Sequence, residues 1–201
     1  MKPALARERE LGLEFDWRPY TLEIPSYLGS ARKEKGAVVE SSGRSPKIWN
    51  AIRYAYKDAR RYAEQQGYIL KGTEKIWDSS IANMGILFVN LYFRDRLPQY
   101  LEAVYPPFWR RELDIEDIDV VKGCLENAEV DSSGFDDFVS GNGKTMHDQI
   151  LTHRFDVGMY GVPTYVLGEE VFFGREHLPY IRWSLTGKRG TPPDVCNELT
   201  V

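Results

Sequence analysis

The spacing of apolar residues predicts a long helical block that separates two short regions of strand pattern. Residues 3–11 are typical of the end of a helix, which Gly12 stops. Residues 13–18, LEFDWR, alternate apolar and polar side chains, which is the period of a β-strand. Residues 25–44 are rich in serine, glycine and charge, so they predict an exposed connecting loop.

The block from 45 to 157 carries several helical patterns. Its first helix is predicted to begin at Ser45 and Pro46, a capping residue followed by proline at the first helical position. Gly67 is expected to end this helix. A second helix has apolar residues at alternating spacings of four and three, namely Trp77, Ile81, Met84, Phe88 and Leu91.

The rest of the block predicts shorter helices. A third helix is expected to begin near Pro98 and to be bent or broken at Pro106–Pro107. A fourth is capped by Asp117, and its inner face is formed by Val121, Cys124, Leu125 and Ala128. Two more helices are predicted over about 133–140 and 144–157.

The most informative stretch is GVPTYVLGEEVFFG, which covers residues 161–174. It predicts a strand, a tight turn at Gly168, a second strand and then a helix from Arg175. Because proline removes a donor from the strand ladder, Pro163 is expected at the head of the first strand. The residues after Gly187 are polar and predict a loose tail.

Composition and charge narrow the class of protein. The 201 residues are 42% hydrophobic and 28% charged, which is ordinary for one globular domain or one domain with an insertion. The net charge of −4, with no strongly basic stretch to overrule it, argues against a nucleic-acid-binding protein. The longest apolar run, residues 81–93, is shorter than the roughly 20 residues of a membrane span, so a buried helix is expected and no membrane partner.

The N-terminus and the two cysteines indicate the cellular compartment of the protein. The charged N-terminus lacks the apolar core of a signal peptide. Cys124 and Cys196 are far apart and form no CxxC motif, which suits a reducing environment. A cytoplasmic location is therefore expected.

Four other patterns do not indicate a catalytic or ligand-binding site. Residues 141–145, GNGKT, resemble the end of a phosphate-binding loop, but Phe138 stands where the first glycine is required, which favours a turn between helices. The three histidines lack metal-ligand spacing, so no metal is expected. Cys124 on an apolar helix face is better explained as a buried hydrophobic residue than as a nucleophile. Residues 108–114, FWRRELD, are explained by an aromatic core followed by solvated charges.

Three segments occur together, in this order, in one protein family: LEFDWRPY at 13–20, FWRRELDIE at 108–116, and GVPT with FFGRE between 161 and 176. On these motifs the chain resembles DsbA-like thioredoxin-fold proteins of the 2-hydroxychromene-2-carboxylate isomerase branch, related to kappa-class glutathione transferases. The resemblance spans residues 2 to about 187. It implies an α/β fold, with a thioredoxin-like core from residues 1–24 and 158–187, a large all-helical insertion at 45–157, and a flexible tail at 188–201.

The family's first strand and the loop with its catalytic serine or cysteine have no counterpart in this chain. The core is therefore expected to be incomplete, the catalytic residue is unassigned, and this form is expected to be inactive. A shortened gene prediction and a naturally shortened, noncatalytic relative both explain this. Since the absent strand would be central, the strands at 13–18 and 164–167 are expected not to pair with each other, and the chain to be prone to aggregation.

The resemblance implies glutathione as co-substrate, and its thiolate would add to a conjugated double bond, allow rotation and then be expelled. The backbone of Val162, beside a cis Pro163, would pair with the cysteinyl part of glutathione. Gly174, Arg175 and Glu176 would receive the γ-glutamyl group, although a simple helix cap explains that turn as well.

Trp77, Asp78 and Trp109 are expected on the side of the second substrate, a conjugated or aromatic small molecule. A homodimer is compatible with the resemblance. Two alternative functions stay open. One is a DsbA-type thiol–disulfide oxidoreductase whose CxxC lies in the absent segment, and the other is a noncatalytic binding protein that keeps only the fold.

Overall fold

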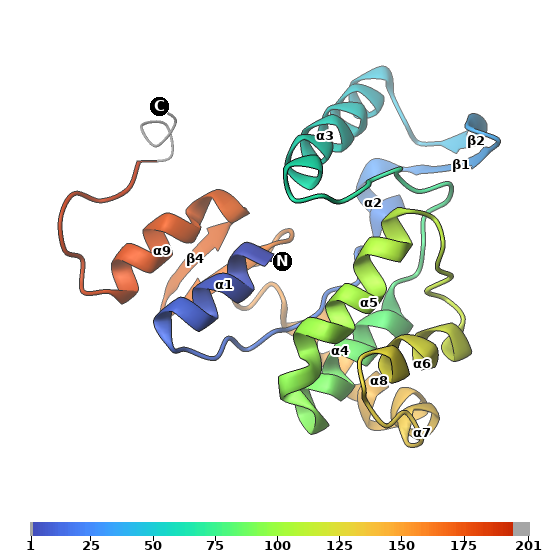
Figure 1. The fold of residues 1–201 in the computed structure, drawn as a ribbon. Coiled ribbons are helices and arrows are strands. Elements are labelled where there is room, and N and C mark those ends of the chain that lie inside the picture. The colour runs from blue at the N-terminus through green and yellow to red at the C-terminus, as the bar shows by residue number, and fades with distance from the viewer. Residues whose placement is uncertain (1, 195–201) are drawn as a thin grey trace. The chain divides into compact units, whose positions relative to one another are not determined.

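The computed structural model describes residues 2–194, and the chain divides into two compact units (Figure 1). The first unit joins the two ends of the chain, residues 1–17 and 149–201. The second unit is continuous and consists of residues 18–148.

The first unit is built around a two-stranded antiparallel hairpin. Its elements are α1 (Lys2–Leu11), β3 (Thr164–Leu167), β4 (Glu170–Phe173), the 3₁₀ turn η2 (Arg175–His177) and α9 (Leu178–Leu185). Thr164 lies opposite Phe173, and Gly168 makes the turn at φ 62°, which costs glycine little. Helix α1 packs against α9 and ends before Gly12, as predicted. Residues 188–194 form neither helix nor strand, and the rest of the predicted tail lies outside the described residues.

Residues 13–18 do not form the predicted strand. The N–H of Leu13 donates to the carbonyl of Glu8, and the N–H of Phe15 donates to the Glu8 carboxylate at 2.7 Å. The same carboxylate accepts from the indole of Trp17 at 3.0 Å. A strand exists only where a neighbour pairs with it, and within residues 2–194 strand β3 pairs with β4 alone. The prediction that the two segments do not pair with each other is therefore confirmed, whereas the strand at 13–18 is wrong.

The second unit contains most of the helices. Its elements are α2 (Ile24–Leu28), β1 (Ser30–Glu34), β2 (Ala37–Ser42), α3 (Pro46–Gln65), α4 (Ser80–Tyr92), η1 (Arg94–Arg96), α5 (Leu97–Trp109), α6 (Ile118–Asn127), α7 (Phe135–Ser140) and the first half of α8 (Asn142–His153).

Residues 25–44 are not the connecting loop that their composition suggested, because they carry α2 and the β1–β2 hairpin. Lys35 and Gly36 both have positive φ, 48° and 84°, as a two-residue hairpin turn requires. The pairing register shifts between Arg32 and Lys33, and this irregularity interrupts the alternating pattern that identifies a strand.

The core of the second unit lies among α4, α5, α6 and α7 (Figure 1). Residues 82–89 of α4 are all buried, and Phe88 meets Phe135 and Phe138 edge to face with ring centroids 5.4 and 5.2 Å apart. The predicted inner face of α6 is buried as well, at Val121, Cys124, Leu125 and Ala128. The predicted caps also form, since Ser45 accepts from the N–H of Ile48, and Asp117 from those of Asp119 and Val120.

Helix α5 is not broken at Pro106–Pro107 but continues to Trp109. Because Pro107 has no N–H, the helix supplies no donor four residues on for the carbonyl of Ala103. The Sγ atom of Cys124 lies 3.6 Å from that oxygen and donates to it. The thiol thus stabilises a proline-containing helix end. Burial also raises the pKa of Cys124, which fits a core residue and not a nucleophile.

Candidate functional site

The two parts of the predicted glutathione site meet at one end of the β3–β4 hairpin. The Val162–Pro163 peptide bond is cis, the isomer that the resemblance implied. The carbonyl of Pro163 accepts a hydrogen bond from the N–H of Gly174 at 2.9 Å. The residue before β3 and the residue after β4 are therefore adjacent.

Glycine is required at position 174. Gly174 has φ 106° and ψ 148°, a conformation that residues with a side chain rarely adopt. A Cβ atom there would collide with Oε2 of Glu176, so the Glu176 carboxylate lies directly over the glycine. Burial, together with the charge of Glu176, raises the pKa of Tyr165, and the nearby Arg175 opposes this rise. Sequence reasoning missed Tyr165, whose pKa these two charges influence.

Val162 presents an available backbone. The residue is 42% exposed, and within residues 2–194 its N–H and C=O make no hydrogen bond to the chain. A free backbone amide beside a strand can pair with the backbone of a peptide, as in strand addition. Val162 thus offers one donor and one acceptor to an extended backbone.

The second unit holds a separate cavity of about 320 Å³. Trp77 and Phe108 form its aromatic wall and meet edge to face at 5.8 Å between ring centroids. The cavity is lined by Thr73, Glu74, Trp77, Phe108, Arg111, Glu112, Leu113 and Asp114.

Of the three residues predicted on the substrate side, only Trp77 is among those that line the cavity. Asp78 accepts the N–H of Ser80 at the start of α4. Trp109 packs against Phe108 and Tyr56, with ring centroids 5.1 and 6.3 Å away. Asp78 and Trp109 are therefore sequence neighbours of the lining residues Trp77 and Phe108, but neither of them lines the cavity.

Arg111 holds one wall of the cavity in place. Its Nε donates to the carbonyl of Gly72 at 2.7 Å, and its Nη1 contacts Oε1 of Glu74 at 2.9 Å. It does so from a backbone with φ 61°, at the residue after the C-cap of α5, where glycine is usual. The interactions of the guanidinium offset that strain. Residues 108–114 are thus more than a core followed by solvated charges, and no local sequence pattern marks this contact with loop 71–74.

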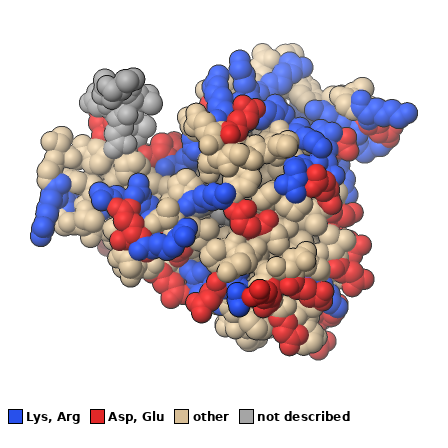
Figure 2. Space-filling view, viewed as in Figure 1, with Lys and Arg blue, Asp and Glu red and all other residues tan. Residues whose placement is uncertain are grey.

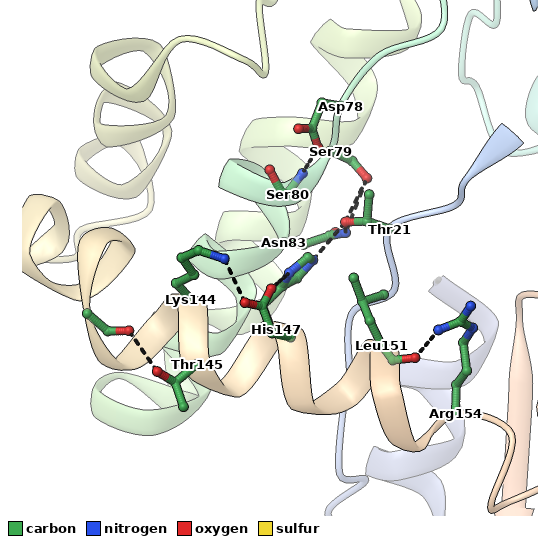
Figure 3. A network of polar contacts seen from close by, with 12 residues as sticks. Thr21, Asp78, Ser79, Ser80, Asn83, Lys144, Thr145, His147, Leu151 and Arg154 are labelled. Atoms are coloured by element: carbon green, nitrogen blue, oxygen red, sulfur yellow. Dashed lines mark hydrogen bonds and ion pairs between the residues drawn. The ribbon is translucent and has the colours of Figure 1, made fainter. Parts of the chain in front are cut away.

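A buried polar network lies elsewhere in the second unit (Figure 3). Oγ1 of Thr21 lies 2.8 Å from Nε2 of His147 and accepts from Nδ2 of Asn83, also at 2.8 Å. Asn83 and His147 are only 7% and 5% exposed. Because these polar atoms are paired with one another, the network fastens residue 21 to α4 and α8. In the part of the chain that the structure describes, no cluster of three or more His, Cys, Asp or Glu residues could hold a metal ion.

Charge is unevenly distributed along the second unit. Lys and Arg gather over α3 and the β1–β2 hairpin (Figure 2), and residues 30–65 contain nine of them against four Asp and Glu. The chain as a whole carries −4, so the acidic surplus lies in the remaining residues, which include the cavity wall. Across residues 2–194, no helix has the length and apolar character needed to cross a membrane.

Comparisons with known proteins agree on the relationship. The family model of the DSBA-like thioredoxin domain matches residues 3–185. A 2-hydroxychromene-2-carboxylate isomerase from Sphingobium xenophagum is 26% identical over 94 residues, which are 45% of this chain and 48% of that protein. The match thus spans about half the length of this curated relative.

A solved structure of a selenomethionine-labelled 2-hydroxychromene-2-carboxylate isomerase shares the fold. It superposes with a TM-score of 0.66 at 19% identity, covering 92% of this chain and 86% of that one. The fold is therefore thioredoxin-like and rich in helices, as the sequence predicted. Since the family model extends over nearly all the described residues, from α1 to the end of α9, the chain belongs to the DSBA-like thioredoxin domain family.

Proposed function

We propose that this chain carries the glutathione-binding part of an isomerase or transferase-like enzyme that acts on a conjugated or aromatic small molecule, without the catalytic serine or cysteine of that class. The observation that supports the proposal is the hydrogen bond between the Pro163 carbonyl and the Gly174 N–H, because it holds together the two segments to which the resemblance assigns glutathione binding. The two isomerases among the similar proteins support the reaction class.

Each residue has a defined part in holding glutathione. The free N–H and C=O of Val162 pair with the backbone of the cysteinyl residue. The turn that begins at Gly174 receives the γ-glutamyl group, with Arg175 opposite its carboxylate and Glu176 opposite its ammonium. When bound, glutathione supplies the thiol whose thiolate adds to the conjugated double bond and later leaves. The chain's own residues orient that thiol.

No observation favours the oxidoreductase alternative. That alternative places its CxxC outside this chain, and Cys124 does not replace it, because Cys124 is buried and burial raises its pKa. Cys196 lies outside the described residues.

The proposal is tested by titrating the 201-residue chain with glutathione in a calorimeter. We expect binding, and we expect Glu176→Ala to weaken it about fivefold, because the exposed carboxylate contributes up to about 1 kcal/mol to an ion pair. Glu169→Ala removes an exposed carboxylate from the turn of the same hairpin and is the matched control, which should bind as the unmodified chain does.

The dipeptide Cys-Gly sharpens the test, because it lacks the γ-glutamyl group. It should bind more weakly than glutathione, and Glu176→Ala should leave its affinity unchanged. Absence of glutathione binding, or an equal loss for both peptides, would contradict the proposed site.

A further inference from the structure

The wall of the Trp77 cavity contains more carboxylates than cations, which favours a positively charged ligand. Its ionisable residues are one guanidinium, that of Arg111, and the carboxylates of Glu74, Glu112 and Asp114. The guanidinium is already engaged by the carbonyls of Gly72 and Lys71 and by Glu74. A carboxylate ligand would therefore meet no uncommitted cation in this wall.

The neighbouring cations are paired as well. The Nζ atom of Lys75 lies 2.5 Å from Oε2 of Glu116, and the Nε atom of Arg110 lies 2.8 Å from Oε2 of Glu112. The lining itself therefore carries three carboxylates against one cation. Each carboxylate has about four acceptor positions, so single contacts leave capacity for a further donor.

The aromatic part of the wall favours a ligand with a ring. The ammonium of Lys75 lies 4.2 Å from the centroid of the Trp77 ring, so the cation of this ring is supplied by the protein and the ligand's charge belongs beside the carboxylates. Phe108 adds a second ring edge to face with Trp77. The volume of about 320 Å³ is at the lower end of ligand-binding cavities and fits a molecule with a single ring.

We propose that this cavity binds a small aromatic ammonium, with the ring against Trp77 and Phe108 and the charged nitrogen facing Glu112 and Asp114. This assignment goes beyond the proposed function and does not rest on it, because the cavity lies within the second unit and binding there needs no glutathione.

Three probes of similar size test the proposal by calorimetry on the full chain without glutathione: benzylammonium, benzyl alcohol and benzoate. Benzylammonium should bind about tenfold more tightly than benzoate, with benzyl alcohol between them. Glu112→Gln should weaken benzylammonium about fivefold and leave benzyl alcohol unchanged. Trp77→Leu should weaken both ligands, because the ring contact is lost.

Glu64→Gln on α3, away from the cavity lining, is the matched control and should change no affinity. The proposal is overturned if benzoate binds as tightly as benzylammonium, if none of the probes binds, or if Glu64→Gln acts as strongly as Glu112→Gln. A separate glutathione titration distinguishes the two proposals. Benzylammonium binding without glutathione binding leaves the cavity assignment standing and refutes the enzyme, whereas normal glutathione binding with a preference for benzoate refutes only the cavity assignment.

Discussion

The two candidate sites are built in opposite ways. At the end of the β3–β4 hairpin the main chain forms the site, through the free amide of Val162 and the contact between Pro163 and Gly174. In the second unit, side chains form the cavity, and Arg111 holds the wall at residues 72–74 in place. The first site therefore depends on backbone conformation, and the second depends on one guanidinium.

Both sites contain a residue with positive φ, and the difference between these residues is instructive. Gly174 adopts φ 106° without a side chain, so that the carboxylate of Glu176 can lie over it. Arg111 adopts φ 61° despite its side chain, because the guanidinium makes contacts that glycine could not. Adding a side chain at Gly174 should therefore increase backbone strain, whereas replacing Arg111 by glycine should relieve it.

The largest effect is expected for Gly174→Ala. The new Cβ forces an unfavourable φ and displaces Glu176, so we expect a loss of about 1–3 kcal/mol in the free energy of unfolding. Gly168→Ala in the hairpin turn is the control, since its φ is 62° and no atom lies within 4 Å of the added carbon. It should cost only about 1 kcal/mol. Urea unfolding followed by circular dichroism measures both, and equal losses would mean that the contact with Glu176 has no structural role.

A smaller effect is expected for Arg111→Ala, which removes the guanidinium but keeps the strained backbone. We expect a loss of about 1–2 kcal/mol in the free energy of unfolding. Arg111→Gly removes the same contacts but adopts φ 61° freely, so it should be more stable than the alanine variant by roughly 1 kcal/mol. The same unfolding measurement applies. If alanine is tolerated as well as glycine, the backbone at this position is not strained.

The smallest effect concerns the ion pair beside the cavity. The hydrogen bond from Lys75 holds the pKa of Glu116 below its ordinary value of 4.5. A carboxyl whose pKa is lowered by folding stabilises the folded state above its ordinary pKa and loses that contribution as the pH falls through the lowered value. Both groups are partly exposed, so solvent screening limits the effect to about 1 kcal/mol or less.

Glu116→Gln should therefore lower the melting temperature slightly at neutral pH, and the difference from the unmodified chain should vanish in acid. Thermal melts at a series of pH values measure this convergence. A constant difference across the acid range would show that the carboxylate acts through packing and not through its charge.

The sequence by itself determined the features that depend on neighbours a few residues away. Ser45 and Asp117 were identifiable as helix caps because their side chains accept from N–H groups two or three positions on. The apolar run 81–93 was expected to form a buried helix because an apolar helix lowers its free energy by leaving water, and residues 82–89 are buried, whereas Leu91 and Tyr92 are exposed. The turn at Gly168 and the order of β3, β4 and α9 were also local properties.

Only the tertiary structure decided the features that join distant residues. The alternation of residues 13–18 matched a strand, but without a pairing partner among the described residues the segment is held by Glu8 instead. Arg111 reaches Gly72 across 39 positions, and Cys124 reaches the Ala103 carbonyl across 21. The physical reason is that a residue pattern records local preference, whereas pairing, clamping and cavity formation depend on which distant groups the folded chain brings within hydrogen-bonding distance.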